Sequence, residues 1–409
     1  MRVLFISQYF PPEIGAPSAR TYEHAQVWRD AGHDVTVLCA FPNHPHGIVP
    51  EKYRGHWVVE ENCDGIRVWR CFHLAVPNKG VLKRSLSFFT FMVSAIVTGA
   101  FRRGAFDVVV ATSPQLLCGL AGWVVARLRG LPFVLEIRDL WPQQIVDLGI
   151  LRNRALIRML YGLERFLYKR AKHIVTTAPA MTEDLIRRGV PSDKVTTIPN
   201  GIDVSFFRPL PRENEVREIY GWAPEDVIVM YIGTLGLSQG FETIIEAAAL
   251  LQSEERMRFV IVGAGAARER IERLIQERRL SNVTLLPAQD KDRMPLFYAA
   301  GDIHLVPLRR LPVFRTNIPS KMFEIMACAR PMVVGIEGQA CSLLEQAQAG
   351  IAVRPEDAQA YAEAIRRLAN NPSLREKLGE NGRAYVVQHH DRRKKAQEFM
   401  EVLERVTRV

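Results

Sequence analysis

The amino-acid sequence predicts an α/β protein made of two Rossmann-like domains, each with a parallel β-sheet. At 409 residues the chain is long for a single hydrophobic core. Short apolar segments alternate with longer helical segments through both halves, a pattern typical of parallel strands joined by helical crossovers. Polar or glycine-rich loops follow several of the expected strands, where doubly wound sheets bind ligands. We therefore expect domains over residues 1–204 and 205–390, followed by a C-terminal helix over 391–409.

Composition excludes several classes of protein. Hydrophobic residues make up 48% and charged residues 24% of the chain, as in an ordinary soluble globular protein. The net charge of +10 is diffuse, and no basic run alternates with aromatic residues, so we expect no nucleic-acid partner. The six cysteines show no metal-binding spacing, and several lie in apolar stretches, which favours a reduced, cytoplasmic protein without a bound metal. The N-terminal residues 2–6 predict a strand rather than a signal peptide.

The first half begins with a βαβ unit. A strand over 3–6 leads into a loop that contains Gly15, a helix continues to Gly32, and a second strand covers 35–38. Gly15 follows the first strand, at the edge of the sheet where doubly wound folds bind ligands. It is either an ordinary turn glycine or part of a binding loop.

A cation and a carboxylate follow a later strand of the same half. Buried strands are expected over 107–111, 132–137 and 173–177, and Arg138 and Asp139 come directly after the second of these. They stand at the same edge of the sheet as Gly15. The two side chains either neutralise each other or point toward a bound acceptor and a diphosphate.

Two apolar segments of the first half have basic flanks. Residues 85–101 carry no charge and lie between Lys83-Arg84 and Arg102-Arg103, but the run is short of the roughly 20 residues that a spanning helix needs. Residues 151–172 place four leucines on one helical stripe and carry seven basic residues, with Glu164 as the only acid. Each segment is either a buried or solvated helix of a soluble domain or an interfacial helix that binds anionic lipid. Two such segments in one domain favour an enzyme at an anionic membrane surface.

The second half opens with a strand that ends in a glycine-rich loop. The strand covers 227–232, the loop runs from Gly233 to Gly240, and a helix begins at Phe241, an arrangement suited to phosphate. Gly263-Ala-Gly265 follows the next strand, but Arg268 occupies the third glycine position of a dinucleotide motif, so that signal is weak. A further strand over 283–286 leads into the loop 287–290.

The stretch from Arg315 to Pro331 is the strongest candidate for a nucleotide site. Pro319 suits the first position of a helix that runs to about residue 329, and Ile318 before it offers no capping oxygen. Unpaired amides beside Ser320 and Lys321 would then suit a phosphate. Glu324 lies one turn, about 5–6 Å, further along, which matches the spacing from phosphate to ribose in a nucleotide. The alternative is a buried helix capped by Asn317 or Thr316, with Glu324 in solvent.

Three sequence signatures resemble glycosyltransferase family 4, the retaining GT-B enzymes. They are Glu324-Ile-Met-Ala followed by Pro331-Met-Val-Val, Pro199-Asn-Gly-Ile-Asp203, and Arg138-Asp139 at a strand end. The resemblance implies a GT-B fold, in which the two sheets face a central cleft and the C-terminal helix crosses back to the first domain. It also implies that the first domain binds the acceptor and the second a nucleotide-sugar. The Pro-Ser-Lys-x-Phe-Glu form resembles a branch that transfers N-acetyl-L-fucosamine or a related sugar from UDP in O-antigen and capsule assembly.

The resemblance also implies roles for individual residues. Asp139, Lys321 and Glu324 are the expected catalytic residues, with Glu324 on the ribose hydroxyls. The expected contacts to the nucleotide-sugar come from Gly15, Arg138, Gly233, Thr234, Pro287, Gln289, Arg315, Asn317, Ser320, Lys321 and Glu324. The chain departs from the family pattern at Ala16, Arg138, Thr234, Gln239 and Thr316, where the family usually has Gly, His, Arg, Lys and Glu. With two cations missing, Lys321 and Arg315 must carry more of the diphosphate charge.

These features together predict a retaining glycosyltransferase. It would move a sugar, expected to be an N-acetylated amino sugar, from a UDP-sugar to a lipid-linked or saccharide acceptor without a metal or other cofactor. We expect it in the cytoplasm, peripheral to the inner face of an anionic membrane. One alternative is a UDP-sugar epimerase of the same fold, which needs paired carboxylates and a histidine. Another is a non-catalytic nucleotide-binding protein, which the missing glutamate and cations favour. The sequence does not specify the sugar, the acceptor or the oligomeric state.

Overall fold

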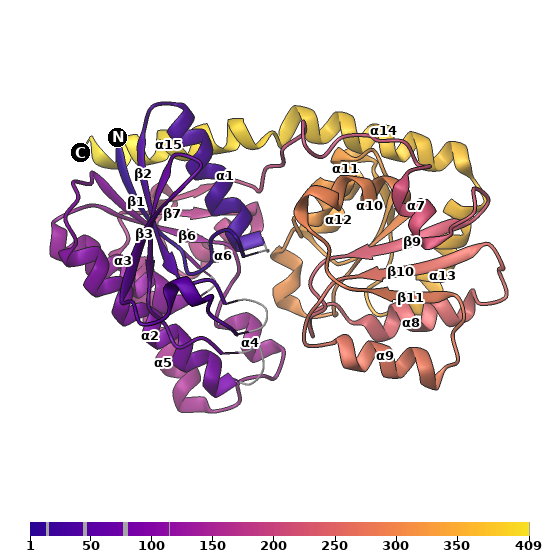
Figure 1. Ribbon diagram of the computed structural model, residues 1–409, viewed down its shortest axis with the longest axis horizontal. Coiled ribbons are helices and arrows are strands. Elements are labelled where there is room, and N and C mark those ends of the chain that lie inside the picture. The colour runs from indigo at the N-terminus through magenta and orange to yellow at the C-terminus, as the bar shows by residue number, and fades with distance from the viewer. Residues whose placement is uncertain (14–15, 44–46, 77–80, 114, 409) are drawn as a thin grey trace. The chain divides into compact units, whose positions relative to one another are not determined.

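The chain folds into two α/β units. The computed structural model describes residues 1–13, 16–43, 47–76, 81–113 and 115–408. Residues 1–200 and 392–409 form the first unit, and residues 201–391 form the second (Figure 1). Gly15, one of the predicted ligand contacts, lies outside the described residues.

The first unit is built on an eight-stranded sheet in the order β3-β4-β2-β1-β5-β6-β7-β8. Apart from β3, every strand runs parallel to its neighbours, and the parallel strands are mostly buried runs of valine, isoleucine and leucine, as expected for strands covered on both faces. The strands are β1 (Arg2–Ile6), β2 (Asp34–Ala40), β3 (Val58–Cys63), β4 (Ile66–Cys71), β5 (Val108–Thr112), β6 (Phe133–Ile137), β7 (His173–Thr176) and β8 (Val195–Thr197).

The antiparallel pair β3 and β4 is an addition that the sequence analysis missed. Asp64 and Gly65 join the two strands, and both have positive φ, of 50° and 80°. An Asp-Gly pair with this geometry is the preferred two-residue hairpin connection. The hairpin therefore extends the parallel sheet with one antiparallel edge strand.

Helices cover the first sheet, and the C-terminal helix returns to it. They are α1 (Ala16–Asp30), α2 (Val81–Phe101), α3 (Leu116–Arg129), α4 (Gln143–Asp147), α5 (Arg154–Arg170), α6 (Pro179–Arg187) and α15 (Arg392–Thr407), with short 3-10 helices η1 (Glu51–Tyr53) and η2 (Ser192–Lys194). The indole N–H of Trp28 donates to the carbonyl of Ala396 at 2.7 Å, and Trp28 also packs edge-to-face on Phe399. The last helix is thus part of the core of the first unit.

A buried ion pair joins α1 to the sheet. Arg20 is 6% exposed and Glu136 is fully buried, and Arg20 Nε donates to Glu136 Oε1 at 2.8 Å. Arg20 also donates to the carbonyls of Ile198 and Pro199 and to Asn200 Oδ1, which anchors the Pro-Asn-Gly signature. Burial opposes ionisation of Glu136, but the positive charges of Arg20 and Arg138 outweigh it and hold its pKa at about 2. Because Arg20 makes all of these bonds, its desolvation is compensated.

The second unit has a fully parallel six-stranded sheet in the order β11-β10-β9-β12-β13-β14. The chain reverses direction across the sheet between β9 and β12, and ligands of open α/β sheets bind at such a point. The strands are β9 (Val227–Ile232), β10 (Met257–Val262), β11 (Val283–Leu286), β12 (Ile303–Pro307), β13 (Met332–Gly335) and β14 (Gly350–Ala352). The helices are α7 (Glu215–Tyr220), α8 (Phe241–Leu250), α9 (Arg268–Glu277), α10 (Met294–Ala300), α11 (Lys321–Ala327), α12 (Gln339–Ala347), α13 (Ala358–Ala369) and α14 (Pro372–His389), with η3 (Lys291–Arg293) and η4 (Pro312–Thr316).

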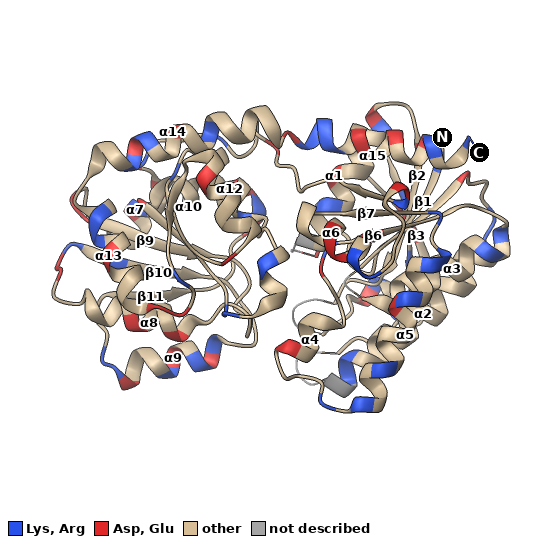
Figure 2. Cartoon of the chain, turned by 180° about the vertical axis from the view of Figure 1, so that it is seen from behind, with Lys and Arg blue, Asp and Glu red and all other residues tan. Residues whose placement is uncertain are grey.

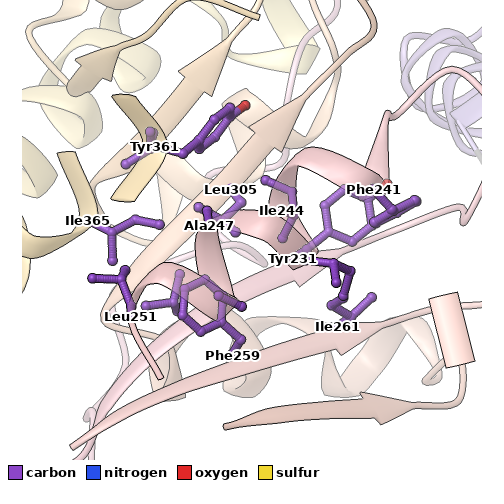
Figure 3. Packing of buried hydrophobic residues seen from close by; sticks show 14 of the residues in the cluster. Tyr231, Phe241, Ile244, Ala247, Leu251, Phe259, Ile261, Leu305, Tyr361 and Ile365 are labelled. Carbon is purple, nitrogen blue, oxygen red and sulfur yellow. The ribbon is translucent and has the colours of Figure 1, made fainter. Parts of the chain in front are cut away.

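The core of this unit lies between the sheet and the helices α8 and α13. Figure 3 shows Tyr231 from β9 beside Phe241 at the start of α8, with Phe259 and Ile365 deeper in the same cluster. The rings of Tyr231 and Phe241 meet edge-to-face, 4.9 Å apart. This packing places the end of β9 firmly in the core, directly before the glycine-rich loop.

The Gly263-x-Gly265 pair serves loop packing. A Cβ on Gly263 would lie 1.9 Å from the carbonyl oxygen of Gly233, and one on Gly265 would lie 2.3 Å from that of Leu235. The amide of Leu235 donates to the carbonyl of Ala264 at 2.9 Å, so the loops after β9 and β10 lie against each other. Only glycine permits so close an approach. This accounts for the two glycines without a dinucleotide.

Candidate active site

The candidate site lies at the carboxyl ends of β9 and β12, where the sheet of the second unit changes direction. The loop from Gly233 follows β9, and the segment that leads to α11 follows β12. The topology therefore brings the glycine-rich loop and the predicted nucleotide helix to the same edge.

Helix α11 begins later and is shorter than predicted. It starts at Lys321 rather than at Pro319, and the amides of Met322 and Phe323 donate to the carbonyls of Pro319 and Ser320, both at 3.0 Å. The expectation that the amides of the first turn lack partners is therefore wrong for these two groups. Ser320, at the cap position, makes no side-chain bond to the helix. The amides of Met322 and Phe323 are satisfied instead by 3-10-type backbone bonds. The helix stops at Ala327, and Ala329 has a left-handed φ of 53°.

Lys321 reaches from α11 to the glycine-rich loop. Its Nζ lies 3.7 Å from the centre of the Tyr231 ring, and a Cβ placed on Gly233 would lie 2.8 Å from that nitrogen. Burial lowers the pKa of Lys321 to about 7, although the nearby Glu324 carboxylate favours the charged form. An anion bound beside this ammonium group would stabilise its charge. Lys321 Nζ thus lies beside Gly233, at the start of the glycine-rich loop.

Glu324 is bound by a tyrosine that the sequence analysis did not identify. The hydroxyl of Tyr298 donates to Glu324 Oε2 at 2.5 Å, and Tyr298 is 1% exposed. Burial, followed by the negative charge of Glu324, raises the pKa of the Tyr298 hydroxyl well above its usual value. Tyr298 belongs to an ordinary apolar run in α10, 26 residues before Glu324. Nothing in that local pattern distinguishes it from any other core aromatic residue.

The loop after β9 is braced by its own polar groups. The hydroxyl of Tyr231 donates to the carbonyl of Thr234 at 2.7 Å, while the side chain of Thr234 is exposed. Gln239, at the position where the family usually has lysine, accepts from the amide of Gly236 and the hydroxyl of Ser238, both at 3.1 Å. The residue that replaces the second cation therefore stabilises the loop itself.

Other predicted contacts stand in the second unit with partners of their own. Gln289 Nε2 donates to the carbonyl of Pro287 at 3.2 Å, so both belong to one turn after β11. Arg315 is 64% exposed, and its Nε lies 3.5 Å from Glu337 Oε2, so its charge is paired with that carboxylate. The Thr316 hydroxyl donates to the carbonyl of Val313 at 3.0 Å, and the amide of Asn317 donates to that of Phe314. Neither bond involves Lys321 or Glu324.

Arg138 and Asp139 stand in the first unit, at the carboxyl end of β6 as predicted. Burial lowers the pKa of the Arg138 guanidinium, and the carboxylates of Glu136 and Asp139 act against that effect. Arg138 Nε and Nη1 are buried and have no hydrogen-bond partner among the described residues. Buried donors of this kind normally meet a partner, so they mark a place where an anion can bind. Within the described ranges, no group of three or more His, Cys, Asp or Glu residues is arranged to hold a metal ion.

A glycine-rich loop, a lysine and a glutamate therefore meet at the edge of the second sheet where open α/β folds bind their ligands. Residues 15–201 match the glycosyl transferase 4-like domain, and residues 212–385 match the glycosyl transferases group 1 domain. The chain is therefore a glycosyltransferase composed of these two domains.

Relatives and solved structures agree with this class. The chain is 29% identical over 381 residues to the Escherichia coli (strain K12) protein provisionally named colanic acid biosynthesis glycosyl transferase WcaI, covering 90% of this chain and 92% of that one. It is 34% identical over 172 residues to the alpha-D-kanosaminyltransferase of Streptomyces kanamyceticus, covering 42% and 43%. Sucrose-phosphate synthase from Thermosynechococcus elongatus has a TM-score of 0.79 at 21% identity, covering 99% and 98% of the two chains. Anabaena Alr3699/HepE in complex with UDP and glucose has a TM-score of 0.75 at 18% identity, covering 99% of each. The predicted GT-B fold is confirmed.

Proposed function

We propose that this glycosyltransferase moves a sugar from a UDP-sugar to a lipid-linked or saccharide acceptor in the assembly of a bacterial surface polysaccharide. The observation that carries the proposal is the position of Lys321 Nζ beside Gly233. Lys321 and Glu324 lie about one turn apart on the same helix, α11. The ammonium group is suited to the diphosphate and the carboxylate to the ribose hydroxyls. Two relatives point to the product and the sugar: one is named for colanic acid biosynthesis and another for an aminosugar, kanosamine.

The proposed reaction is retaining transfer without a metal. The acceptor hydroxyl oxygen forms a bond to the anomeric carbon while the bond from that carbon to the diphosphate oxygen breaks. The electron pair of the broken bond leaves with UDP, and the hydroxyl proton passes to an oxygen of the leaving diphosphate. Lys321 stabilises the negative charge that develops on the diphosphate, which is the largest electrostatic demand of this step. Thr234 carries no charge, and Arg315 is paired with Glu337. The cation beside Gly233 in this proposal is therefore Lys321.

Arg138 supports an anionic acceptor. Its buried Nε and Nη1 have no partner among the described residues, and they stand at the ligand-binding edge of the first sheet. A guanidinium group is well matched to phosphate, which it can bind through two parallel hydrogen bonds. A polyprenyl-diphosphate-sugar therefore fits this position better than a neutral saccharide.

A reaction with defined components tests the proposed function. We expect the purified full chain, given a panel of UDP-sugars and a polyprenyl-diphosphate-sugar, to release UDP and add one sugar to the lipid, as mass spectrometry would show. Isomerisation of the UDP-sugar without an acceptor would identify an epimerase instead. Binding of UDP without either reaction would indicate a non-catalytic nucleotide-binding protein.

The first unit has a surface that fits an anionic membrane, which the proposed lipid acceptor requires. Helix α2 is long and apolar enough, from Lys83 to Phe101, to cross a membrane by length and composition alone, and 33% of that window is buried. One face of α2 packs on α3, and five apolar side chains at intervals of three or four residues are exposed on another face. They are Leu86, Phe89, Val93, Val97 and Phe101.

A second helix with basic residues, α5, also packs on α3. It carries exposed Leu156 and Met159 among exposed cations. Figure 2 shows the basic segments of α5 in blue. The exposed cations in and next to α5 are Arg152, Arg154, Arg158, Arg165, Lys169, Arg170 and Lys172. Glu164, the acid expected among them, is buried and accepts from the Tyr168 hydroxyl at 2.8 Å. Apolar side chains beside exposed cations match the interface of an anionic bilayer.

Vesicle flotation tests this surface. The full chain should float with phosphatidylglycerol-containing vesicles, and binding should fall as salt is raised through physiological strength. Replacing Arg154 and Arg158 with glutamate should remove most of the binding, whereas the same change at the exposed Arg256 and Arg273 of the second unit should have little effect. Equal flotation with neutral phosphatidylcholine vesicles would contradict the electrostatic contribution.

A further inference from the structure

Two fully buried tyrosines contact the two charged side chains of the candidate site. Tyr231 in β9 is 0% exposed and Tyr298 in α10 is 1% exposed. One contacts Lys321 and the other contacts Glu324. They lie near enough that Tyr231 is among the groups that raise the pKa of Tyr298.

Tyr231 holds Lys321 and the glycine-rich loop together. Its hydroxyl donates to the carbonyl of Thr234 at 2.7 Å, and its ring lies under Lys321 Nζ at 3.7 Å from the ring centre. The ring itself is fixed in the core by Phe241, as Figure 3 shows. An ammonium group over a desolvated aromatic face is attracted to the ring, and this attraction favours that position of the lysine side chain. The ring thus keeps the lysine nitrogen beside Gly233 before any ligand arrives.

Tyr298 holds Glu324 in the same way. The oxygen-to-oxygen distance of 2.5 Å is that of a strong hydrogen bond to a charged acceptor. The ring cannot turn away, since it packs on Phe207 and His304, and His304 Nε2 lies 3.0 Å from the carbonyl of Tyr298. A buried tyrosine hydroxyl needs a partner, and here that partner is a carboxylate at the edge of the site.

We propose that Tyr231 and Tyr298 are positioning residues for the nucleotide: Tyr231 holds Lys321 at the diphosphate, and Tyr298 holds Glu324 at the ribose hydroxyls. This inference rests on the proposed function. Neither tyrosine touches the nucleotide itself. Each acts by removing the freedom of a side chain that otherwise would have to be ordered when the ligand binds, which lowers the cost of binding.

Calorimetry with UDP and 2′,3′-dideoxy-UDP tests the role of Tyr298. Tyr298→Phe removes one oxygen atom and leaves the ring packing in place. We expect UDP to bind about tenfold more weakly to this variant, while the dideoxy analogue binds as it does to the wild type. A third buried tyrosine, Tyr361, supplies the control, because Tyr361→Phe removes a buried hydroxyl of the same unit that lies at Gly335. That variant should keep the full preference for UDP.

A double-mutant cycle tests the role of Tyr231. We expect Tyr231→Leu to weaken UDP binding about tenfold. Tyr231→Phe keeps the ring, so its loss of binding free energy should be less than half of that caused by Tyr231→Leu. In a Lys321→Ala background, Tyr231→Leu should bind UDP no more weakly than Tyr231→Phe, because both lose the hydrogen bond to Thr234 and the ring then has no ammonium group to hold. If Tyr231→Leu does not fold, as circular dichroism would show, Tyr231→Met serves in its place.

The outcomes separate the inference from the function beneath it. A wild-type chain that does not bind UDP would overturn the proposed function. A wild type that prefers UDP to its dideoxy analogue, together with a Tyr298→Phe variant that keeps this preference, would show that Tyr298 only fills the core. If the losses of UDP-binding free energy caused by Tyr231→Leu and Lys321→Ala are additive, Tyr231 does not position Lys321 and only fills the core.

Discussion

Glu324→Ala is expected to weaken UDP-sugar binding at least about 100-fold and to remove the preference for UDP over its 2′,3′-dideoxy analogue. Two ribose hydroxyls donating to one carboxylate contribute about 1.5–3 kcal/mol each, because hydrogen bonds to charged groups have this strength. A carboxylate close to a diphosphate is repelled by it, so only such contacts make its presence there favourable. Calorimetry with the two nucleotides on wild type and variant measures the effect directly.

Glu324→Ala also lowers the stability of the fold, because Glu324 accepts a hydrogen bond from Tyr298. This effect must be separated from the effect on binding. Glu324→Ala leaves the buried Tyr298 hydroxyl without its acceptor, which destabilises the fold by about 1–3 kcal/mol. Glu324→Gln keeps an acceptor oxygen and should lose less of both stability and affinity. Glu337→Ala removes a carboxylate that pairs with Arg310 and Arg315 and should leave the preference unchanged. Equal discrimination by wild type and Glu324→Ala would mean that Glu324 does not bind the ribose.

Lys321→Ala is expected to weaken UDP binding by about 1.5–3 kcal/mol, roughly 10- to 150-fold. The ammonium group lies beside Gly233, and the family's other cations are replaced by Thr234 and Gln239. Lys377→Ala, an exposed lysine of the same unit near α12 and β14, should bind UDP normally. Unchanged UDP affinity for Lys321→Ala in calorimetry would place the diphosphate elsewhere.

The pH dependence gives Lys321 a second signature. With its pKa lowered to about 7, the lysine is charged below pH 7 and loses its proton above it, whereas the bound diphosphate favours the charged form. The affinity should therefore be constant below pH 7 and fall by up to about tenfold per pH unit above it. A UDP-sugar is the proper probe, since the terminal phosphate of UDP itself titrates near pH 6. The Lys321→Ala variant should lack this slope.

Strand and helix order followed closely from local patterns. Short runs of β-branched and other apolar residues, such as 227–232 and 133–137, are the pattern of parallel strands that are buried on both faces. The glycine loop at Gly233 follows from its position after such a strand. The Asp64-Gly65 hairpin was also visible in principle, since an Asp-Gly pair between two alternating segments signals this turn. The start of α11 was misplaced by two residues because Pro319 suits the position before the first turn as well as the first position itself.

The sequence by itself determined the two α/β domains and the candidates Lys321 and Glu324, because strand periodicity, glycine loops and helical spacing are local properties of the chain. Only the tertiary structure decided which candidates have partners. It placed Lys321 on Tyr231 and Glu324 on Tyr298, paired Arg315 with Glu337, and buried Glu164 on α5 away from the exposed cations of that helix. The contacts of Lys321 with Tyr231 and of Glu324 with Tyr298 join residues 90 and 26 positions apart on different strands and helices. Such contacts depend on how the elements pack against one another, and no local pattern encodes that packing.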